Sequence, residues 1–338
     1  MRAAVFAGPE QLAVTDVPTP ACPAGGALLA VEACAVCGTD ARIYRNGHKA
    51  IAPPRILGHE VVGRLIASDN SRAELGQRVT VAPAVGCGQC AACAAGRPNR
   101  CPDLRTIGYQ WDGAFAEVLA IPAEAIAQGS LCPVPDSLPA AQACLAEPLA
   151  CCLNGQELVG TGPGDRVVIA GAGPIGSLHA RLAWSRGAAQ VILIETNPAR
   201  REQAERLGLG TVLADDASLA EHTGGGADVA IVAASVPALY QRAPRWLAKG
   251  GRLSLFAGLP PSETLTPLPA NQIHYDEIVV AGAHGSTPAH NRAALELIVS
   301  GALPAADLVT GMFALDDALA AIEATVAGRG VKNVVSLA

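Results

Sequence analysis

The chain has 338 residues, half of them hydrophobic and 16% charged, with a formal net charge of −6. This length allows two domains, while the acidic balance and an aromatic content of 3% argue against a nucleic-acid partner. No uncharged apolar stretch approaches the roughly 20 residues that cross a bilayer, and the start, Met1–Phe6, does not read as a signal peptide. We therefore expect a cytoplasmic protein without a membrane partner, whose eleven cysteines stay reduced.

The first part of the chain predicts a β-rich domain. Residues 1–6, 27–32 and 78–82 read as strands, and Pro and Gly interrupt the sequence at short intervals, as in a folded β-barrel with irregular loops.

From residue 160 the pattern changes to alternating strands and helices. Repeated βαβ units predict a parallel, doubly wound sheet, so the fold class is α/β. Two helices and a last strand, which can return to the first domain, follow the sheet. The strands expected in the sheet are 166–170, 190–195, 228–233, 252–257 and 278–281; the helices are 174–187, 197–207, 291–300 and 315–326; the last strand is 332–336.

A glycine-rich motif follows the first buried strand of this sheet. Gly171, Gly173 and Gly176, with Pro174 and Ile175 between them, form G-x-G-x-x-G, which lets a backbone turn approach a dinucleotide pyrophosphate at a helix N-terminus. Glu195 ends the next strand, where an acid binds the adenosine ribose and disfavours a 2′-phosphate. Arg200 can either neutralise such a phosphate or lie against the adenine. A plain structural turn is the alternative interpretation.

Four cysteines form a C-x2-C-x2-C-x7-C loop, which indicates a metal site. Four thiolates on one loop can close a tetrahedral shell around Zn²⁺, and a closed shell is structural. An iron–sulfur cluster is the rival interpretation, because C-x2-C-x2-C also occurs in ferredoxins. The four are Cys87, Cys90, Cys93 and Cys101.

A second set of residues suits a catalytic zinc, which takes about three protein ligands and keeps an open position. Cys37 and His59 can supply two ligands, and Glu147 a third, directly or through water. Glu60 can act as an alternate ligand, and Asp40 can hold the far nitrogen of His59. Spacing alone does not establish this site, since His59 can equally be a hydrogen-bonded core residue and Glu147 a charge at a helix end.

Together these motifs resemble the zinc-containing medium-chain dehydrogenase/reductase superfamily, and within it the polyol (sorbitol-type) and threonine dehydrogenase branch. The likeness rests on CGTD at 37–40, GHE at 58–60, the four-cysteine loop, EPL at 147–149, GAGPIG at 171–176 and ETNPAR at 195–200. It implies a GroES-like catalytic domain over 1–153, a Rossmann domain that binds NAD over 154–288, and a segment over 289–338 that returns to the catalytic domain.

The resemblance also assigns roles to residues. Cys37, His59 and Glu147 match the catalytic zinc shell with Glu60 beside it, the four-cysteine loop matches the structural zinc, and Glu195 and Arg200 match the ribose-binding region. Thr39 matches the hydroxyl that takes the substrate proton. Arg42 stands where many relatives have a relay histidine, and arginine does not release a proton near neutral pH. The relay must therefore end elsewhere, with His48 as a candidate, or Arg42 binds substrate.

The implied activity is oxidation of a secondary alcohol in a polyol, sugar alcohol or cyclitol to a ketone, with two zinc ions per subunit and NAD in preference to NADP. An L-threonine or amino-alcohol dehydrogenase is the alternative within the enzymes, and a non-catalytic NAD-binding homologue is the alternative outside them. Residues His284, Ser286 and Thr287 can meet a polyol, or they can belong to a loop that packs subunits or caps the helix of Asn291. A homodimer or homotetramer is expected.

Overall fold

The computed structural model describes residues 1–260, 262 and 265–337. The chain packs into two compact units, one made of residues 1–150 and 285–338 and the other of residues 151–284. The boundaries expected from the sequence, at 153 and 288, stay predictions. No helix in the described part of the chain is long and apolar enough to cross a membrane.

The first unit is built around a mostly antiparallel sheet. Its strands run in the order β10-β6-β5-β3-β18-β17, and β9 also pairs with β3. Alternate residues of these strands enter one core that holds Phe6, Leu29, Leu65 and Phe115. The strands are β3 (Ala27–Ala35), β5 (Glu60–Ser68), β6 (Arg78–Val81), β9 (Val118–Ile121), β10 (Leu131–Pro133), β17 (Val309–Ala314) and β18 (Lys332–Ser336).

Smaller sheets and short helices complete this unit. β1 (Arg2–Gly8) pairs with β2 (Gln11–Asp16) and β4 (Arg55–Ile56), and β7 (Ala84–Val85) pairs with β8 (Arg105–Thr106). The helices are α1 (Gly38–Asn46), α2 (Ala91–Ala94), α3 (Ala123–Ala127), α4 (Ala140–Ala143), α11 (Pro288–Val299) and α12 (Ala318–Val326), with 3-10 turns η1 (Pro98–Arg100), η3 (Ala306–Leu308) and η4 (Leu315–Asp317).

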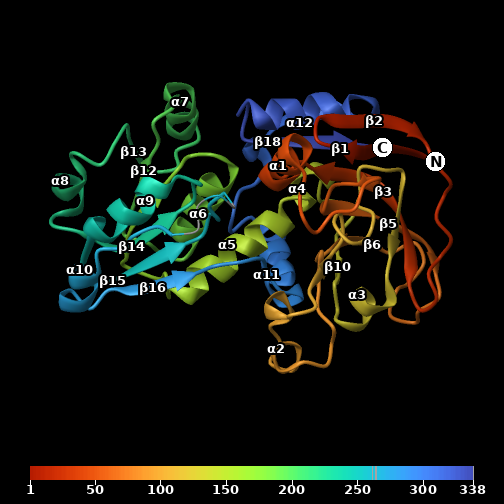
Figure 1. Ribbon diagram of the computed structural model, residues 1–338, viewed down its shortest axis with the longest axis horizontal. Helices are drawn as coiled ribbons and strands as arrows, with labels where there is room; N and C mark the ends of the chain where they lie inside the picture. Colours follow the sequence, from red (N-terminus) through yellow and green to blue (C-terminus); the bar gives the residue numbers. More distant parts are fainter. Residues whose placement is uncertain (261, 263–264, 338) are drawn as a thin grey trace. The chain divides into compact units, whose positions relative to one another are not determined.

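The two ends of the chain meet in the first unit. β18 lies between β3 and β17, antiparallel to the first and parallel to the second. Figure 1 shows the blue C-terminal elements β18 and α12 beside the red N-terminal strands. The last strand of the chain thus pairs directly with a strand of its N-terminal part.

The second unit is a parallel sheet in the order β13-β12-β11-β14-β15-β16. Its strands are β11 (Arg166–Ala170), β12 (Gln190–Ile194), β13 (Thr211–Leu213), β14 (Ala227–Val232), β15 (Leu247–Leu255) and β16 (Val279–Gly282). The connecting helices are α6 (Pro174–Ser185), α7 (Pro198–Arg206), α8 (Leu219–Thr223), α9 (Pro237–Arg242) and α10 (Ala270–Tyr275), with η2 (Ala243–Trp246) after α9. α5 (Ala146–Leu158) precedes the sheet.

Both faces of this sheet are buried. Val167, Ile169 and Val191 pack on one face with residues of α6 and α7, whereas Val168 and Ile192 pack on the other with residues of α8 and η2. Parallel strands buried on both faces need continuous apolar runs, which is why RVVIA and QVILI form the sheet centre. The predicted doubly wound α/β sheet is confirmed.

Candidate metal sites and the nucleotide-binding turn

Three side chains gather where β3 ends and β5 begins. Ala35 of β3 pairs with Glu60 of β5, so Cys37, two residues beyond Ala35, comes beside the His59-Glu60 pair. One potential ligand atom from each of Cys37, His59 and Glu60 lies within 4.8 Å of the others. His59 and Glu60 are buried and Cys37 is partly buried. A thiolate, an imidazole and a carboxylate form a donor set that suits Zn²⁺.

Asp40 fixes both Cys37 and His59. One carboxylate oxygen of Asp40 accepts the backbone N–H of Cys37 at 2.9 Å, which caps α1, and the other lies 3.3 Å from Nδ1 of His59. Burial disfavours the imidazolium, but the charges of Asp40 and Cys37 outweigh it and raise the pKa of His59 well above its ordinary value. Because Nδ1 faces Asp40, Nε2 is the nitrogen available to a metal.

Glu60 has a second buried partner that the sequence did not reveal. Nζ of Lys332, on β18, lies 2.7 Å from one carboxylate oxygen of Glu60 and 2.6 Å from the other. Burial raises the pKa of Glu60 to about 7, against the opposing charge of Lys332. The Glu60 carboxylate can therefore interact with two positive charges. One is the buried ammonium of Lys332, and the other is any cation held by Cys37 and His59.

Glu147 is buried in the first turn of α5 and is not one of the three grouped ligands. Its charge nevertheless acts on Glu60 and Lys332, since it raises the pKa of each. Glu147 therefore contributes negative potential to this group, and its predicted role as a third ligand stays a prediction.

Thr39 and Arg42 form a hydrogen bond on the exposed side of α1. Nη2 of Arg42 donates to Oγ1 of Thr39 at 2.9 Å. The guanidinium can only donate, so it takes up one lone pair of the threonine and leaves the hydroxyl hydrogen to point elsewhere. Arg42 thus positions the Thr39 hydroxyl and does not accept its proton.

Tyr109 lies against two imidazole rings. Its ring centroid is 5.9 Å from that of His59 and 5.4 Å from that of His48, with edge-to-face geometry in both pairs. The backbone N–H of Ala50 donates to Nδ1 of His48 at 3.2 Å and fixes that ring. Burial, then the charge of Lys49 and that of Arg42, lower the pKa of His48. In the neutral ring the proton is consequently on Nε2, which weakens the case for His48 as the end of a proton relay.

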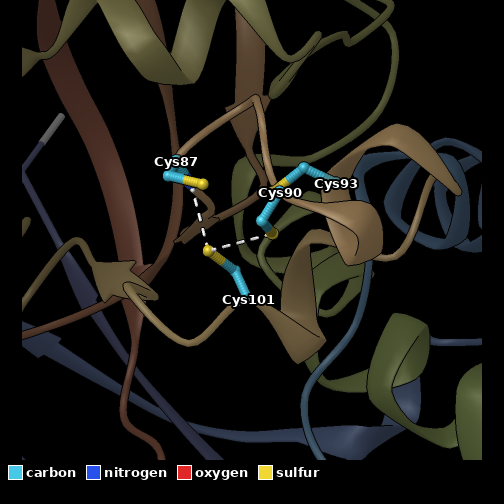
Figure 2. A group of neighbouring side chains, drawn as sticks. All are labelled: Cys87, Cys90, Cys93 and Cys101. Carbon is cyan, nitrogen blue, oxygen red and sulfur yellow. Dashed lines mark hydrogen bonds between the residues drawn. The ribbon is translucent and has the colours of Figure 1, made fainter.

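The four predicted cysteines come together on one loop, which Figure 2 shows. Their sulfur atoms all lie within 4.8 Å of one another, and Sγ of Cys90 is 3.7 Å from Sγ of Cys101. Tetrahedral Zn–S bonds of about 2.3 Å place sulfur atoms about 3.8 Å apart, so the loop fits a single ion. The several iron atoms of an iron–sulfur cluster would hold their cysteines farther apart.

Backbone N–H groups of this loop stabilise the thiolate of Cys87, whereas burial raises the pKa of Cys93 to about 12 and raises that of Cys101. The backbone N–H of Cys87 donates to Sγ of Cys101 at 3.2 Å, and the backbone N–H groups of Gln89 and Cys90 lower the pKa of Cys87 to about 7. A Cβ at Gly86 would lie 2.5 Å from Sγ of Cys93, so the loop closes only with glycine at that position.

The glycine motif forms the turn between β11 and α6. Gly171 has a φ of 103°, and a Cβ at Gly176 would lie 1.9 Å from the carbonyl oxygen of Gly171, so both positions require glycine. Gly173 caps α6, and a Cβ there would meet nothing within 4 Å. Pro174 and Ile175 form the first turn of α6. The open space at Gly173 and the helix N-terminus suit a pyrophosphate.

Glu195 connects this turn to the turn between β12 and α7. One carboxylate oxygen accepts the N–H of Ala172 at 3.0 Å and the other accepts that of Asn197 at 2.9 Å. Nη1 of Arg200 lies 4.0 Å from Glu195, close enough for a loose ion pair. Each carboxylate oxygen keeps lone-pair capacity for a ribose hydroxyl after these bonds.

Two polar residues at the start of the C-terminal part of the first unit cap a helix. Oγ1 of Thr287 accepts the N–H of His290 at the start of α11, and Oγ of Ser286 accepts a hydrogen bond from the Asn291 amide at 3.0 Å. Both side chains are buried. Of the interpretations for Ser286 and Thr287, these contacts support capping.

The chain matches known families over both units. Residues 23–136 match the alcohol dehydrogenase GroES-like domain family, and residues 174–300 match the zinc-binding dehydrogenase family. Sorbitol dehydrogenase of Bacillus subtilis (strain 168) is 31% identical over 335 residues, which cover 96% of this chain and 93% of that protein. L-threonine 3-dehydrogenase of Pyrococcus horikoshii is 34% identical over 268 residues, 75% of this chain and 74% of that protein.

A solved structure of a similar protein supports the same family. A proposed zinc-binding dehydrogenase of Sinorhizobium meliloti 1021, crystallised with NADP, superposes with a TM-score of 0.90 at 31% identity, covering 99% of each chain. The chain therefore belongs to the zinc-containing medium-chain dehydrogenase/reductase superfamily, in its polyol and threonine dehydrogenase branch. The predicted family is confirmed.

Proposed function

We propose that this protein oxidises a secondary alcohol of a polyol, sugar alcohol or cyclitol to the ketone, with zinc and NAD. The observation that carries the proposal is the group of Cys37, His59 and Glu60, whose donor atoms lie within 4.8 Å of one another. Sorbitol dehydrogenase and L-threonine 3-dehydrogenase relatives support oxidation of a CH–OH group in general.

Cys37, His59 and Glu147 would hold the catalytic zinc, with Glu60 as an alternate ligand, and the four-cysteine loop would hold the structural one. When bound, the catalytic zinc supplies Lewis acidity toward an alcohol oxygen and the nicotinamide accepts the hydride. The protein holds His59 in one tautomer through Asp40, so that Nε2 stays available. Two zinc ions per chain are thus expected.

Thr39 is the residue that takes the alcohol proton in this proposal. Its Oγ1 is held by Arg42 at 2.9 Å, which aims the hydroxyl and adds a fixed positive charge beside the oxygen that loses a proton. Since arginine stays protonated, the proton leaves Thr39 through cofactor hydroxyls or water and not through Arg42.

NAD is favoured over NADP because the carboxylate of Glu195 stands at the end of β12. Its negative charge repels a 2′-phosphate and its free lone pairs suit ribose hydroxyls. Arg200, at 4.0 Å from Glu195, supports the opposite choice, as does the relative crystallised with NADP. Parallel assays with both cofactors decide the matter.

The active form is proposed to be a homodimer or homotetramer. β16 is an edge strand of the parallel sheet, and its Val279 side chain is 54% exposed. An edge strand with an exposed apolar residue can pair with a second copy. We keep the domain ranges 1–153, 154–288 and 289–338 within this proposal.

The test is NADH formation by the zinc-loaded protein on sorbitol, galactitol, inositols, amino-cyclitols, L-threonine and simple secondary alcohols, with NADP in parallel. Turnover of a polyol or cyclitol that Cys37→Ala abolishes supports the proposal. Turnover of L-threonine alone moves the protein to the amino-alcohol alternative. Inertness toward the whole panel, with zinc and NAD bound, supports a non-catalytic homologue.

A further inference from the structure

The side-chain amide of Gln128 forms two hydrogen bonds with the backbone of one residue, Gly86. Its Oε1 accepts the N–H of Gly86 at 3.0 Å, and its Nε2 donates to the carbonyl oxygen of Gly86 at 2.6 Å. Gln128 is the C-cap residue of α3 and lies 42 residues from Gly86 in the sequence. The carboxamide thus pairs with Gly86 as a neighbouring backbone peptide would, with one donor and one acceptor.

Gly86 occupies the position at which this pairing acts most directly on the four cysteines. It immediately precedes Cys87, and β7 ends one residue before it. A Cβ at Gly86 would lie 2.5 Å from Sγ of Cys93 and 3.2 Å from Cβ of Cys101, so the Gly86 backbone lies against two more of the cysteines. Gln128 therefore holds, from outside the four-cysteine loop, the point at which three of its cysteines meet.

The requirement for glycine at residue 86 makes an outside support necessary. Glycine has more backbone freedom than any other residue, so it fixes the direction of the following chain poorly. A larger side chain at this position, which could hold the segment by packing, would collide with Cys93. The two hydrogen bonds from Gln128 restrict the backbone where the sequence of the loop itself cannot.

A cavity of about 290 Å³ borders the same segment, and its wall includes Gly86, Cys87 and Glu124 of α3. Cys87 is partly exposed. An ion held by four thiolates leaves by losing one ligand at a time, and the first thiolate to move away needs space. Cys87 has that space beside it, so the Gly86–Cys87 segment is the part of the loop that can open first.

We propose that Gln128 is a positioning residue of the four-cysteine site, whose paired hydrogen bonds keep the Gly86–Cys87 segment against the other cysteines and so slow the loss of the ion. This inference rests on the structural zinc site of the proposed function and not on the alcohol oxidation. Gln128 does not touch the ion in this role. Its removal should therefore leave the loop able to bind zinc and should change how long the zinc stays.

The test follows the release of zinc from the full-length, zinc-loaded protein to an excess of a coloured chelator. Gln128→Met keeps the length of the side chain and removes both hydrogen bonds. Release from the four-cysteine loop should become about 10- to 100-fold faster, the usual effect of losing a group that holds a metal ligand in place. The Cys37→Ser protein, which retains only the loop ion, identifies the phase of the release that belongs to the loop.

Gln110→Met is the matched control. The side-chain oxygen of Gln110 also accepts a backbone N–H, that of Thr106 at 2.8 Å, but both residues follow the four-cysteine loop in the sequence. The same substitution there should leave the release of both ions unchanged. The ion of the Cys37–His59–Glu60 group is an internal control, because that group lies in the same unit. If Gln128 acted only on the stability of the unit, Gln128→Met would quicken the release of both ions equally.

Hydrogen exchange on the wild type tests the same pairing without a variant. The amide hydrogen of Gly86 should exchange at least about tenfold more slowly than in an unstructured peptide, since it is held by Gln128. A fast exchange, an unchanged release rate in Gln128→Met, or equal acceleration for both ions would overturn the inference.

The outcome also separates this inference from the proposed function. A wild-type loop that binds no zinc would overturn the inference together with the structural zinc site. Selective loss of the loop ion in Gln128→Met, in a protein that oxidises none of the alcohols above, would support the role of Gln128 while the proposed oxidation fails.

Discussion

Lys332 and Glu60 form a buried ion pair between β18 and β5, with Nζ at 2.6 and 2.7 Å from the two carboxylate oxygens. The exposed fractions of the two side chains are 3% and 0%. The pair therefore neutralises a carboxylate that water does not reach, directly beside His59, and it ties the last strand of the sheet to the candidate metal group.

Replacing Lys332 with Met should leave the Glu60 carboxyl buried without its partner, so that it must either stay charged in the interior or take up a proton at a pKa raised still further. We expect the metal-free protein to lose about 3–5 kcal/mol of unfolding free energy, measured by urea denaturation. The double variant Lys332→Met/Glu60→Leu, which removes both charges, should regain much of that loss.

The exposed pair of Arg206 and Glu202 provides the control for this experiment. Its atoms are 2.8 Å apart, but both side chains are more than 60% exposed. Arg206→Met should change stability by about 0.5 kcal/mol or less. A Lys332→Met effect no larger than that of Arg206→Met would contradict the importance of the buried pair.

Alanine should lower the stability of the protein at one glycine of the turn between β11 and α6 and leave it unchanged at another. Gly176→Ala places a Cβ 1.9 Å from the carbonyl oxygen of Gly171, so the strand and helix must separate, at a cost of about 1–3 kcal/mol or more. Gly173→Ala meets no atom within 4 Å and keeps an ordinary φ of −72°. Its stability should stay within about 0.5 kcal/mol of the wild type.

Alanine at Gly173, although harmless to stability, should weaken cofactor binding. An alanine methyl at Gly173 occupies the open space where the pyrophosphate is proposed to lie, so the Kd for NADH should rise at least about tenfold, the equivalent of 1.4 kcal/mol. Fluorescence titration with NADH measures this. Wild-type affinity in the folded Gly173→Ala protein would place the pyrophosphate elsewhere.

His179 should make stability depend on pH. It is fully buried in α6, and burial, with a smaller effect of Arg186, lowers its pKa to about 3. Below about pH 6.5 His179 therefore binds a proton in the unfolded chain but not in the folded chain. The contribution of His179 to the free energy of unfolding is complete above about pH 6.5 and declines as the pH falls toward 3. Between pH 7 and pH 5 this single group should cost about 2 kcal/mol.

The measurement is urea unfolding of metal-free protein at both pH values. His179→Gln should lose about 2 kcal/mol less than the wild type over this interval, whereas His222→Gln, which alters an exposed histidine of the same unit, should behave like the wild type. Equal losses in all three proteins would show that His179 does not carry the effect.

Cys101 and Cys37 should account for one zinc ion each. Cys101→Ser removes one sulfur from the four-cysteine group, whose sulfur atoms lie within 4.8 Å of one another. Cys37→Ser removes the sulfur from the Cys37–His59–Glu60 group. We expect zinc content measured by mass spectrometry to fall from two ions per chain to one in each variant. Cys22→Ser, outside both groups, should keep two, and an unchanged content in Cys101→Ser would refute the structural site.

Much of the fold was predictable because periodicity is local. Apolar runs gave the central strands of the parallel sheet, and Asn197 caps α7 as its position before Pro198 indicates. The strand expected to begin at Arg252 instead begins at Leu247, since its backbone stays paired with β14 through a bulge around Lys249-Gly250-Gly251. Those residues look like a turn when taken alone.

The grouping of candidate ligands was predictable where one motif holds several of them, as in the four-cysteine loop and the His59-Glu60 pair. Lys332 and Tyr109 were missed because their importance comes from contacts with residues far away in the chain. A lysine within the apolar strand KNVVS is a weak signal of a buried partner, but nothing in its spacing names Glu60. For Tyr109 no local signal distinguishes it from other loop aromatics.

The first unit is formed by both ends of the chain, so it cannot be completed until synthesis has ended. Glu60 leaves the ribosome 272 residues before Lys332, which at about 5–20 residues per second is a delay of roughly 15 to 55 s. Throughout that time the nascent chain carries a carboxylate meant for the interior without its ammonium partner. Completion of the metal-ligand group must therefore wait until the entire parallel-sheet unit has been synthesised, and zinc or a chaperone that reaches Glu60 earlier meets an unfinished domain.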